Sequence, residues 1–391
     1  MVVEGLKYGR PERAQAQTFV TLAGQTFSFD PAQWLSSLDA HGWDNMRALT
    51  ASDDSFVAGL VLHTAGQWFG RRRLAAYAVS AVVVAPPFRG ERVGRRLMLE
   101  GLRETRAAGI PLSVLYASTP AFYRSVGYEP AGERRFCRAP ITALPSERVG
   151  ARYVELAPEQ QAEARELYQR FARERSGLLA RTDHFWRSHF QPYDGSKRSL
   201  YRIDFPEGPE GYVSFQHGFP DKTLVVDDAI ATTPRSVLAL LSLFSRYQPQ
   251  AQWVRFPDGA GGPFHQLIAD YGACPDAMDD WLLRITDVAA ALAGRGYPPL
   301  DAVLELEVVD AALPENGGRY KLRVSGGGGM VERGGAGRLR LDVRALAAIF
   351  SGFKHPREML AAGLLHAVSD DEVELLGAVF AGPRPFMLDS F

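Results

Sequence analysis

The stretch AVVVAPPFRGERVG, residues 81–94, decides the fold. It opens with Ala81–Ala85, an apolar run that is too short for a helix and rich in β-branched residues, which predicts a buried strand. Pro86 and Pro87 end that strand, because proline has no N–H to donate to a sheet. A loop, Phe88–Arg95, then leads into a helix. The apolar side of this helix carries Val93, Leu97, Met98 and Leu102.

This strand, loop and helix predict a site for a phosphate or pyrophosphate. The first N–H groups of a helix have no partner inside it, and the helix dipole places positive partial charge there. Gly90 and Gly94 lack side chains, so an anion can approach the backbone closely. Four arginines add positive charge around the loop: Arg89, Arg92, Arg95 and Arg96. The alternative interpretation is a basic helix start that is simply solvated.

The residues that follow show a family resemblance. A second strand is expected at Leu112–Ala117, then a short helix at Pro120–Ser125 that Gly127 ends. The loop resembles motif A of the GCN5-related N-acetyltransferases, which reads Gln/Arg-x-x-Gly-x-Gly/Ala. Arg89 and Gly94 match it, while Arg92 stands where the family has its first glycine. The segment ASTPAFYRSVGYEPAG, residues 117–132, resembles motif B of the same superfamily.

The whole chain is similar to the enhanced-intracellular-survival (Eis) family. The resemblance implies an α/β (α+β) architecture of tandem acetyltransferase folds followed by a sterol-carrier-like domain. It implies a catalytic, acetyl-CoA-binding domain at 1–147, a degenerate acetyltransferase-like domain at 148–285, and a sterol-carrier-like domain with a catalytic C-terminus at 286–391. It also implies a homo-oligomer, with a hexamer preferred.

The first 150 residues follow the element order that this fold requires. Helices are expected near Pro11–Leu22 and Pro31–Leu38. The apolar runs Arg47–Ala51 and Phe56–Leu62 flank Ser52–Asp54, whose residue types are typical of a turn, so they predict a hairpin. Helices first, an antiparallel pair next and strand–loop–helix–strand last match the acetyltransferase order.

The middle of the chain repeats that order, as an internal duplication would. Its loop, Ala231–Ser236, has no glycine and one arginine. We therefore expect a structural unit that binds no pyrophosphate. The predicted elements are helices at Pro158–Arg175 and Pro234–Tyr247 and strands at Tyr201–Phe205, Gly211–Gln216, Thr223–Ile230 and Ala251–Phe256.

The last third predicts a smaller sheet with helices, which resembles the sterol-carrier-like module. Its glycine run, Gly326–Gly329, is expected to be an exposed loop without a phosphate site, because no helix follows it. The predicted elements are strands at Ala302–Val309, Arg319–Val324 and Arg338–Val343 and helices at Arg344–Phe350, Pro356–Leu365 and Glu374–Phe380.

Composition excludes several classes of protein. The chain has 391 residues, too many for one ordinary core, and a formal net charge of −1, which gives no overall attraction to nucleic acid. Its apolar runs are shorter than the roughly 20 residues that cross a bilayer, and its first residues lack a signal core. Cys137 and Cys274 stand alone, and His184 and His189, five residues apart, predict no metal site. We therefore expect a cytoplasmic protein without a metal.

Acetyl transfer from a thioester to an amine needs a polarised carbonyl, a base for the amine and an acid for the thiolate. The backbone of Val82–Val84 is expected to polarise the carbonyl. The resemblance makes Tyr123 the general acid, although a tyrosine on an amphipathic helix is otherwise a core residue. Tyr128 is expected to pack. The expected acetyl-CoA site comprises Val82, Val83, Val84, Arg89, Gly90, Glu91, Arg92, Val93, Gly94, Arg95, Ser118 and Thr119.

The resemblance assigns the general base to the C-terminal carboxylate of Phe391. A chain end usually frays in solvent, which is the alternative. Here the tail reads PFMLDSF, residues 385–391, and its apolar Phe386, Met387 and Phe391 could anchor it in a groove. Asp389 and Ser390 are expected to influence substrate choice.

The sequence thus predicts an N-acetyltransferase that moves an acetyl group from acetyl-CoA to a primary amine. The acceptor remains open among an aminoglycoside-like molecule, a polyamine, a lysine side chain and a small arylamine, and transfer of a longer acyl group is an alternative. The rival from another class is a non-catalytic oligomeric scaffold or lipid-binding protein with a vestigial CoA site, which Arg92 in the place of glycine favours.

Overall fold

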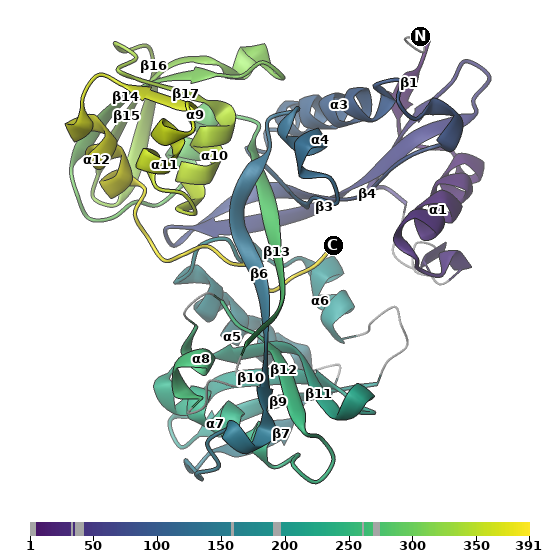
Figure 1. The fold of residues 1–391 in the computed structure, drawn as a ribbon, viewed down its shortest axis with the longest axis vertical. Helices are drawn as coiled ribbons and strands as arrows, with labels where there is room; N and C mark the ends of the chain where they lie inside the picture. Colours follow the sequence, from purple (N-terminus) through teal and green to yellow (C-terminus); the bar gives the residue numbers. More distant parts are fainter. Residues whose placement is uncertain are drawn as a thin grey trace.

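The computed structural model describes residues 5–32, 34–35, 43–157, 160–190, 197–259, 262–268 and 274–391, apart from the side chains of residues 188, 190 and 274. Three lobes meet around the C-terminal segment, which crosses the centre of the molecule (Figure 1). Parts of two predicted helices lie outside the described residues. These are residues 33 and 36–38 of the helix at Pro31–Leu38, and residues 158 and 159 of the helix at Pro158–Arg175.

The first lobe contains the strand–loop–helix unit that the sequence predicts. Its β3 and β4 form a long antiparallel hairpin, and β5 lies parallel to β4. A 3₁₀ turn at Pro86–Phe88 follows the strand, and the helix begins at Val93, within the loop predicted at Phe88–Arg95. The elements are β1 Lys7–Gly9, α1 Arg13–Phe27, β2 Met46–Thr50, β3 Phe56–Phe69, β4 Arg72–Val84, α3 Val93–Ala107, β5 Leu112–Tyr116 and α4 Pro120–Arg124.

The predicted strand at Ala81–Ala85 is the end of a much longer strand, and the prediction that it is buried was wrong for most of it. Among these five residues only Val83 is buried, at 3% exposure. The physical reason is that the pairing of β4 with β5 stops at Val79 and Leu115. Beyond Val79, the edge of β4 that faced β5 has no neighbouring strand and borders an open slot, while β3 still pairs with the other edge.

Two long strands join the first lobe to the second. β6 (Glu129–Pro140) starts in the first lobe and ends in the second, and β13 (Cys274–Ile285) lies between β5 and β6, antiparallel to both. The sheet therefore runs without a break in the order β1-β2-β3-β4-β5-β13-β6-β12-β11-β10-β9-β7, with β8 beside β3. β13 was not predicted from the sequence. It pairs with β5 and β6, which lie far earlier in the chain, and a local pattern does not record such partners.

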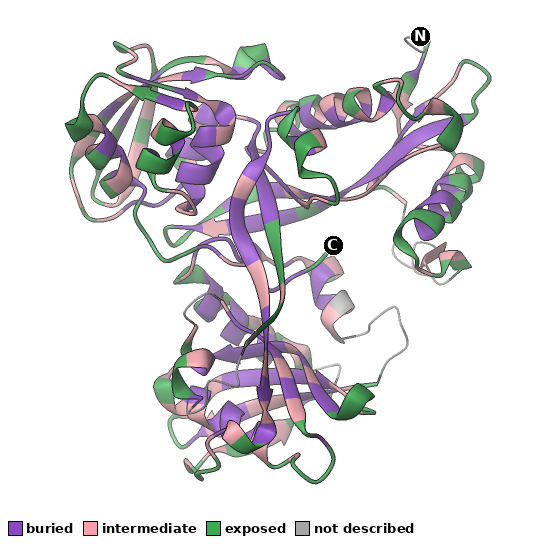
Figure 2. Ribbon diagram, viewed as in Figure 1, coloured by how far each residue is buried: buried purple, intermediate pink, exposed green. Residues whose placement is uncertain are grey.

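The second lobe has the predicted strands and its own apolar core between the sheet and α7 (Figure 2). Helix α7 begins with a capping box, in which Thr233 and Ser236 satisfy each other's backbone N–H. The elements are β7 Arg152–Glu155, α5 Gln161–Arg173, β8 Leu179–Ala180, α6 Asp183–Phe190, β9 Arg198–Phe205, β10 Gly208–Gln216, β11 Thr223–Ala231, α7 Pro234–Ser245, β12 Trp253–Pro257 and α8 Pro263–Leu267.

The third lobe is a five-stranded sheet in the order β16-β15-β14-β17-β18 with helices against it. Gly328 and Gly329 belong to the edge strand β16, so only part of the predicted glycine loop is a turn. The predicted helix at Pro356–Leu365 is also shorter, because Leu365 begins β18. The elements are α9 Val288–Gly294, β14 Ala302–Val309, β15 Gly318–Ser325, β16 Gly328–Arg333, β17 Leu339–Asp342, α10 Val343–Ser351, α11 Pro356–Ala361, β18 Leu365–Ala367 and α12 Asp370–Val379.

A buried ion pair fixes the third lobe to the shared sheet. Arg284 of β13 and Asp310, just after β14, are both fully buried, with Nη2 and Oδ2 2.7 Å apart. The same carboxylate accepts hydrogen bonds from the backbone N–H of Ala312 and Leu313. Removing one member would leave an uncompensated buried charge, which costs about 3–5 kcal/mol.

Candidate active site

The site begins where β4 and β5 separate. Val61 lies opposite Ser80 and Gly59 opposite Val83, so Ala81 and Val82 together face the single residue Leu60. This is a β-bulge, and Ala81 adopts the positive φ of 51° within it. The bulge bends the end of β4 away from β5 and leaves an unpaired strand edge over residues 80–84. That edge can offer backbone N–H groups to a ligand in the slot.

The N-terminus of α3 faces the same end of β4. The first backbone bond of the helix runs from Arg96 N–H to Arg92 O, so the N–H groups of Val93, Gly94 and Arg95 have no partner inside the helix. The side chain of Arg92, the N-cap residue, does not cap them. A Cβ built on Gly94 would lie 3.3 Å from Val84 Cγ2 and 3.4 Å from Phe122 Cζ, so the close packing of the helix on the strand requires a small residue.

Arg92 keeps a backbone conformation that favours glycine. It is the N-cap of α3, with φ 59° and ψ 11°, in the left-handed region. The substitution of the motif glycine therefore leaves the loop geometry intact at a conformational cost of about 1–2 kcal/mol. The main argument for a vestigial loop is weakened accordingly. The Arg89 side chain turns back and donates from Nε to the carbonyl of Val84 at 3.1 Å.

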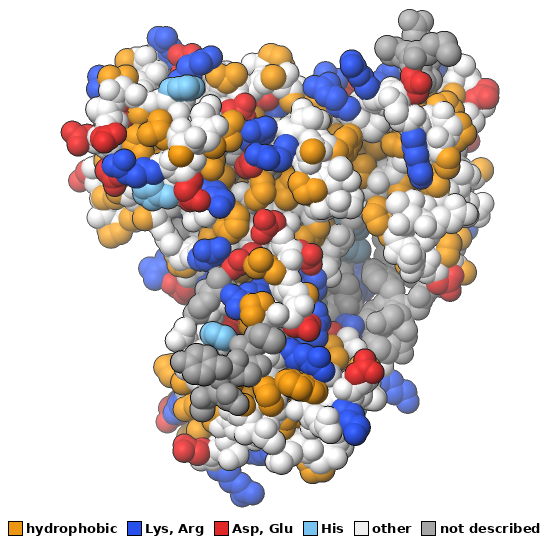
Figure 3. Space-filling view, viewed as in Figure 1, with side chains coloured by type: hydrophobic (Ala, Val, Ile, Leu, Met, Phe, Trp, Pro, Cys, Tyr) orange, Lys and Arg blue, Asp and Glu red, His pale blue; other side chains and the backbone are white. Residues whose placement is uncertain are grey.

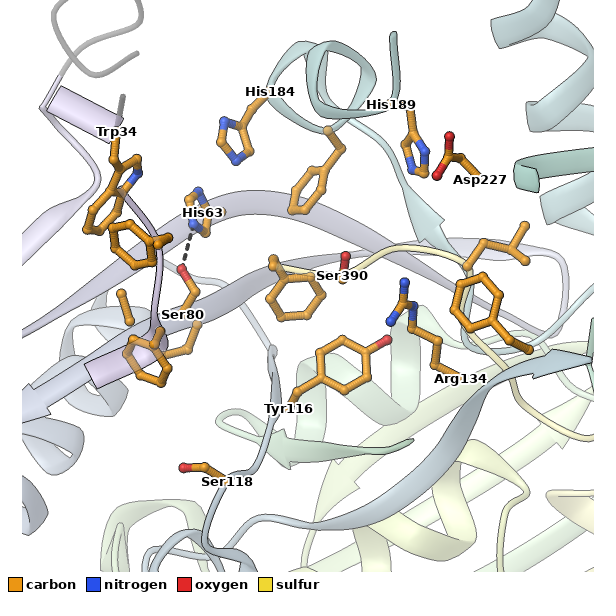
Figure 4. A pocket seen from close by; sticks show the side chains of 18 of the residues that line it. Trp34, His63, Ser80, Tyr116, Ser118, Arg134, His184, His189, Asp227 and Ser390 are labelled. Carbon is orange, nitrogen blue, oxygen red and sulfur yellow. Dashed lines mark hydrogen bonds between the residues drawn. The ribbon is translucent and has the colours of Figure 1, made fainter. Parts of the chain in front are cut away.

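A cavity of about 680 Å³ opens beside the slot, between the first and second lobes (Figure 4). Of the predicted site residues, Val82, Ser118, Tyr123 and Phe391 line it, whereas residues 89–95 lie outside it at the helix start. Thr119 is the exposed N-cap of α4. The sequence analysis missed most of the other lining side chains, among them Trp34, His63, Ser80, Tyr116, Arg134, His184, Phe185, His189 and Asp227.

The two tyrosines of the motif B segment have different surroundings. Tyr123, on α4, is 7% exposed and lines the cavity, and burial raises the pKa of its phenol to about 12. Tyr128 is fully buried, and its hydroxyl lies 2.6 Å from Ser113 Oγ. The phenol of Tyr123 is thus protonated at neutral pH and faces the cavity, while Tyr128 packs in the core.

The C-terminal segment reaches the cavity along β6. Phe386 N–H donates to Ser176 O at 3.1 Å and Met387 N–H to Glu133 O at 2.9 Å. The ring of Phe391 lies 5.3 Å from that of Tyr116 and 5.9 Å from that of Phe185. The tail is therefore fixed by backbone bonds at one end and by aromatic contacts at the other.

Asp389 has contacts that the sequence did not reveal. Its expected influence on substrate choice stays a prediction, while its side chain is buried, and its Oδ1 lies 2.8 Å from Arg181 Nε and 2.8 Å from His189 Nε2. Burial alone would raise the pKa of this carboxyl, but Arg181 and His189 hold it below its ordinary value. The sequence did contain a signal, because an aspartate follows three apolar residues in the tail. If such a tail is buried, its carboxylate needs a partner.

Three histidines, His63, His184 and His189, line the cavity. His63 Nε2 is 2.8 Å from Ser80 Oγ, and its ring stacks on that of His184 at 4.4 Å. Burial, with His184 nearby, lowers the pKa of His63 to about 3, so this ring is neutral. Although His184 and His189 are five residues apart on α6, both line the cavity. No group of three metal-ligating side chains occurs in the described part of the chain.

Models of known protein domains match parts of all three lobes. Models of acetyltransferase (GNAT) domains match residues 8–131 and 177–285, and a model of a sterol carrier protein domain matches residues 288–388. An uncharacterized N-acetyltransferase of Streptomyces coelicolor is 31% identical over 333 residues, 76% of each chain.

This chain belongs to the GCN5-related N-acetyltransferases. It is an acetyl-CoA-dependent enzyme, as the sequence predicts, rather than a non-catalytic scaffold. A solved GCN5-related N-acetyltransferase from Anabaena variabilis is 28% identical, with a TM-score of 0.94 over 99% of this chain and 100% of that chain. Eis1 from Mycobacterium abscessus shares the fold at 24% identity, with a TM-score of 0.81 over 99% and 100%.

The described surface of this acetyltransferase carries charges of both signs (Figure 3). On the face drawn in Figure 3, the described basic and acidic side chains are interspersed, and no large region of one sign is visible. Among the described helices, none has the length and apolar character that would cross a membrane.

The N-terminus of α3 supplies a direct test of acetyl-CoA binding. Gly94→Glu is expected to weaken binding by roughly 100-fold or more, because a like-charge contact with the pyrophosphate costs several kcal/mol. Isothermal titration with acetyl-CoA measures the change. Arg103→Glu, on the exposed side of the same helix, is the control and should leave the dissociation constant within a few-fold. An unchanged constant in Gly94→Glu would contradict the assignment.

Proposed function

We propose that the enzyme transfers acetyl from acetyl-CoA to a primary amine by direct attack, with Tyr123 as general acid and the Phe391 carboxylate as general base, in the manner of the Eis family. One observation carries the proposal: a protonated phenol and the end of the chain line the same cavity, beside the unpaired edge of β4. These are the acid, the base and the carbonyl-polarising group that the reaction needs.

In this mechanism the terminal carboxylate takes a proton from the substrate ammonium, directly or through a water molecule. The amine nitrogen then attacks the thioester carbon, and the carbonyl oxygen receives the displaced electron pair. Backbone N–H groups near Val82 stabilise that oxyanion. As the tetrahedral intermediate collapses and the C–S bond breaks, the Tyr123 hydroxyl protonates the leaving thiolate. The nitrogen, positively charged after the attack, loses its second proton to the Tyr123 phenolate, directly or through water, and the C-terminal carboxyl returns its proton to solvent. The products are the acetylated amine and free CoA, with both groups restored.

The surroundings of the two groups suit these roles. The raised pKa of Tyr123 keeps its phenol protonated at neutral pH, so that a proton is in place when the thiolate leaves. A free α-carboxyl has a pKa near 3.5, too low for an efficient base in water. The role of base therefore requires the carboxylate to be shielded from bulk water or to act through a bound water molecule. The ring contacts of Phe391 with Tyr116 and Phe185 support the role, because they fix the chain end beside the cavity.

The described lining also bears on the acceptor. It holds three guanidinium groups, and each has an acidic partner: Arg198 pairs with Asp227, Arg255 with Asp276 and Arg134 with Asp279. The charges around the lining therefore nearly balance, which offers little to the several positive charges of an aminoglycoside or polyamine, whereas aromatic walls suit an apolar body. We therefore propose an acceptor with one reactive amine and an aromatic or aliphatic body.

An amine panel assayed by release of free thiol tests both parts of this proposal. An arylalkylamine should give a higher kcat/KM than spermidine, kanamycin or a lysine peptide. A strong preference for kanamycin or spermidine would overturn the choice of acceptor, and acetylation of none of the amines would count against the proposed reaction.

The role of Tyr123 predicts a specific kinetic change. Tyr123→Phe removes only the hydroxyl, so fold and acetyl-CoA affinity should persist while kcat falls by ~10²–10⁴-fold, the usual effect of losing a general acid. Thiol release at saturating substrate measures kcat. Tyr128→Phe, which loses the bond to Ser113, should lower the melting temperature more and kcat less. The reverse order would exchange the roles of the two tyrosines.

The role of Phe391 predicts sensitivity at the chain end. Deleting Phe391, or extending the chain with a short C-terminal tag, should remove most activity, because either change moves or converts the carboxylate. Phe391→Ala should be milder, since it keeps a carboxylate and loosens only its aromatic contacts. Melting temperature and acetyl-CoA binding should remain close to those of the parent protein. Full turnover in the tagged protein would mean that Phe391 only packs.

We also propose the homo-oligomer, a hexamer by preference, that the Eis resemblance implies. Light scattering that gave the 43.0 kDa of one chain would contradict the oligomer. The domain boundaries and the cytoplasmic location inferred from the sequence stay predictions.

A further inference from the structure

The second lobe has no loop for a pyrophosphate, yet it holds a buried cluster of charges beside the active site. Arg181, just before α6, has a fully buried side chain, as does Asp228 of β11. Asp389 of the tail is 1% exposed. Charges this deep in a protein need a reason, because apolar residues of similar volume are often as stabilising.

Arg181 joins the second lobe to the tail. Its Nη1 lies 2.6 Å from Asp228 Oδ2, within its own lobe, and its Nε lies 2.8 Å from Asp389 Oδ1. Its guanidinium also lies over the ring of Tyr168, with 3.9 Å between Cζ and the ring centroid. Tyr212 donates its hydroxyl to the same oxygen of Asp228 at 2.6 Å. The arginine is thus held from several sides and can act as a rigid anchor.

Asp389, the anchored residue, lies two positions before the C-terminal Phe391. Two residues span at most about 7 Å, so a fixed Asp389 confines the terminal carboxylate to a small volume. Tyr116 adds a second restraint, since its hydroxyl donates to the backbone carbonyl of Asp389 at 2.7 Å. Ser390, between anchor and terminus, lines the cavity (Figure 4).

We propose that Arg181 and Asp389 are positioning residues, through which the second lobe holds the terminal carboxylate in the active site of the first. This inference rests on the proposed role of that carboxylate. It gives the degenerate acetyltransferase-like lobe a part in catalysis without any contact with acetyl-CoA. The pair acts through geometry, because neither side chain needs to touch the substrate.

The two partners of Arg181 offer a matched pair of variants. Asp389→Asn and Asp228→Asn each remove one buried carboxylate from the same guanidinium, so both should lower the melting temperature. Only Asp389→Asn releases the tail, and kcat should fall by ~10²-fold, as expected for a displaced catalytic group. Acetyl-CoA affinity should persist in both. Asp389→Glu, which keeps the charge, should retain more activity than Asp389→Asn.

Release of the terminal phenylalanine by a carboxypeptidase measures tail anchoring without any assay of turnover. Asp389→Asn should release Phe391 faster than the parent and Asp228→Asn proteins. Tyr116→Phe, which loses only the hydroxyl bond to the tail, provides the same measurement if Asp389→Asn does not fold. Equal release rates in the variants and the parent would overturn the anchor.

A double variant separates this inference from the proposed base. If Asp389 acts through Phe391, adding Asp389→Asn to the Phe391 deletion should lower kcat little further, whereas independent effects multiply. Multiplying losses, or equal losses in Asp389→Asn and Asp228→Asn, would refute positioning while leaving the base intact. Full activity in the Phe391 deletion would refute the base itself.

Discussion

The separation of β4 from β5 is the constraint on which the active site depends. Parallel pairing holds the strands together as far as Val79 and Leu115, and the bulge at Ala81 then bends β4 away. One local break in a ladder of hydrogen bonds creates the slot, frees a strand edge and gives α3 room to point its N-terminus at that edge. Tyr123 reaches the same place, because α4 follows β5 directly.

All three lobes contribute to the active site. The first supplies the slot, the second supplies one wall of the cavity together with the buried arginine, and the third supports the tail. Met387 belongs to the apolar core that the first and third lobes share, and Phe391 packs against it. The tail thus packs apolar side chains against this core and pairs the carboxylate of Asp389 with Arg181. This double attachment holds seven residues of irregular backbone in place, although chain ends usually fray.

How much the sequence reveals depends on how far the partners lie from each other in the chain. The order strand–loop–helix at residues 81–107 is encoded locally by periodicity, proline and glycine, and this order was predicted correctly, although the strand is longer and less buried than predicted. Gly94 was predicted from the same local pattern, whereas the role of Tyr123 came from the family resemblance, and both roles stay predictions. The pairing of Asp389 with His189 could not be predicted, because it joins residues 200 positions apart in the chain. Similarly, the exposure of Ala81 and Val82 depends on where a neighbouring strand stops, which hydropathy does not record.

The position of β13 has a consequence for how this protein is made. β5 ends at Tyr116, but its neighbour in the sheet begins at Cys274, after the whole second lobe. A ribosome must therefore complete the middle of the chain before the first lobe can close its sheet. The lobes cannot mature one after another from the N-terminus, as separate domains commonly do. The nascent first lobe must wait with open edges on β5 and β6, where a chaperone can recognise it and a stray strand can pair.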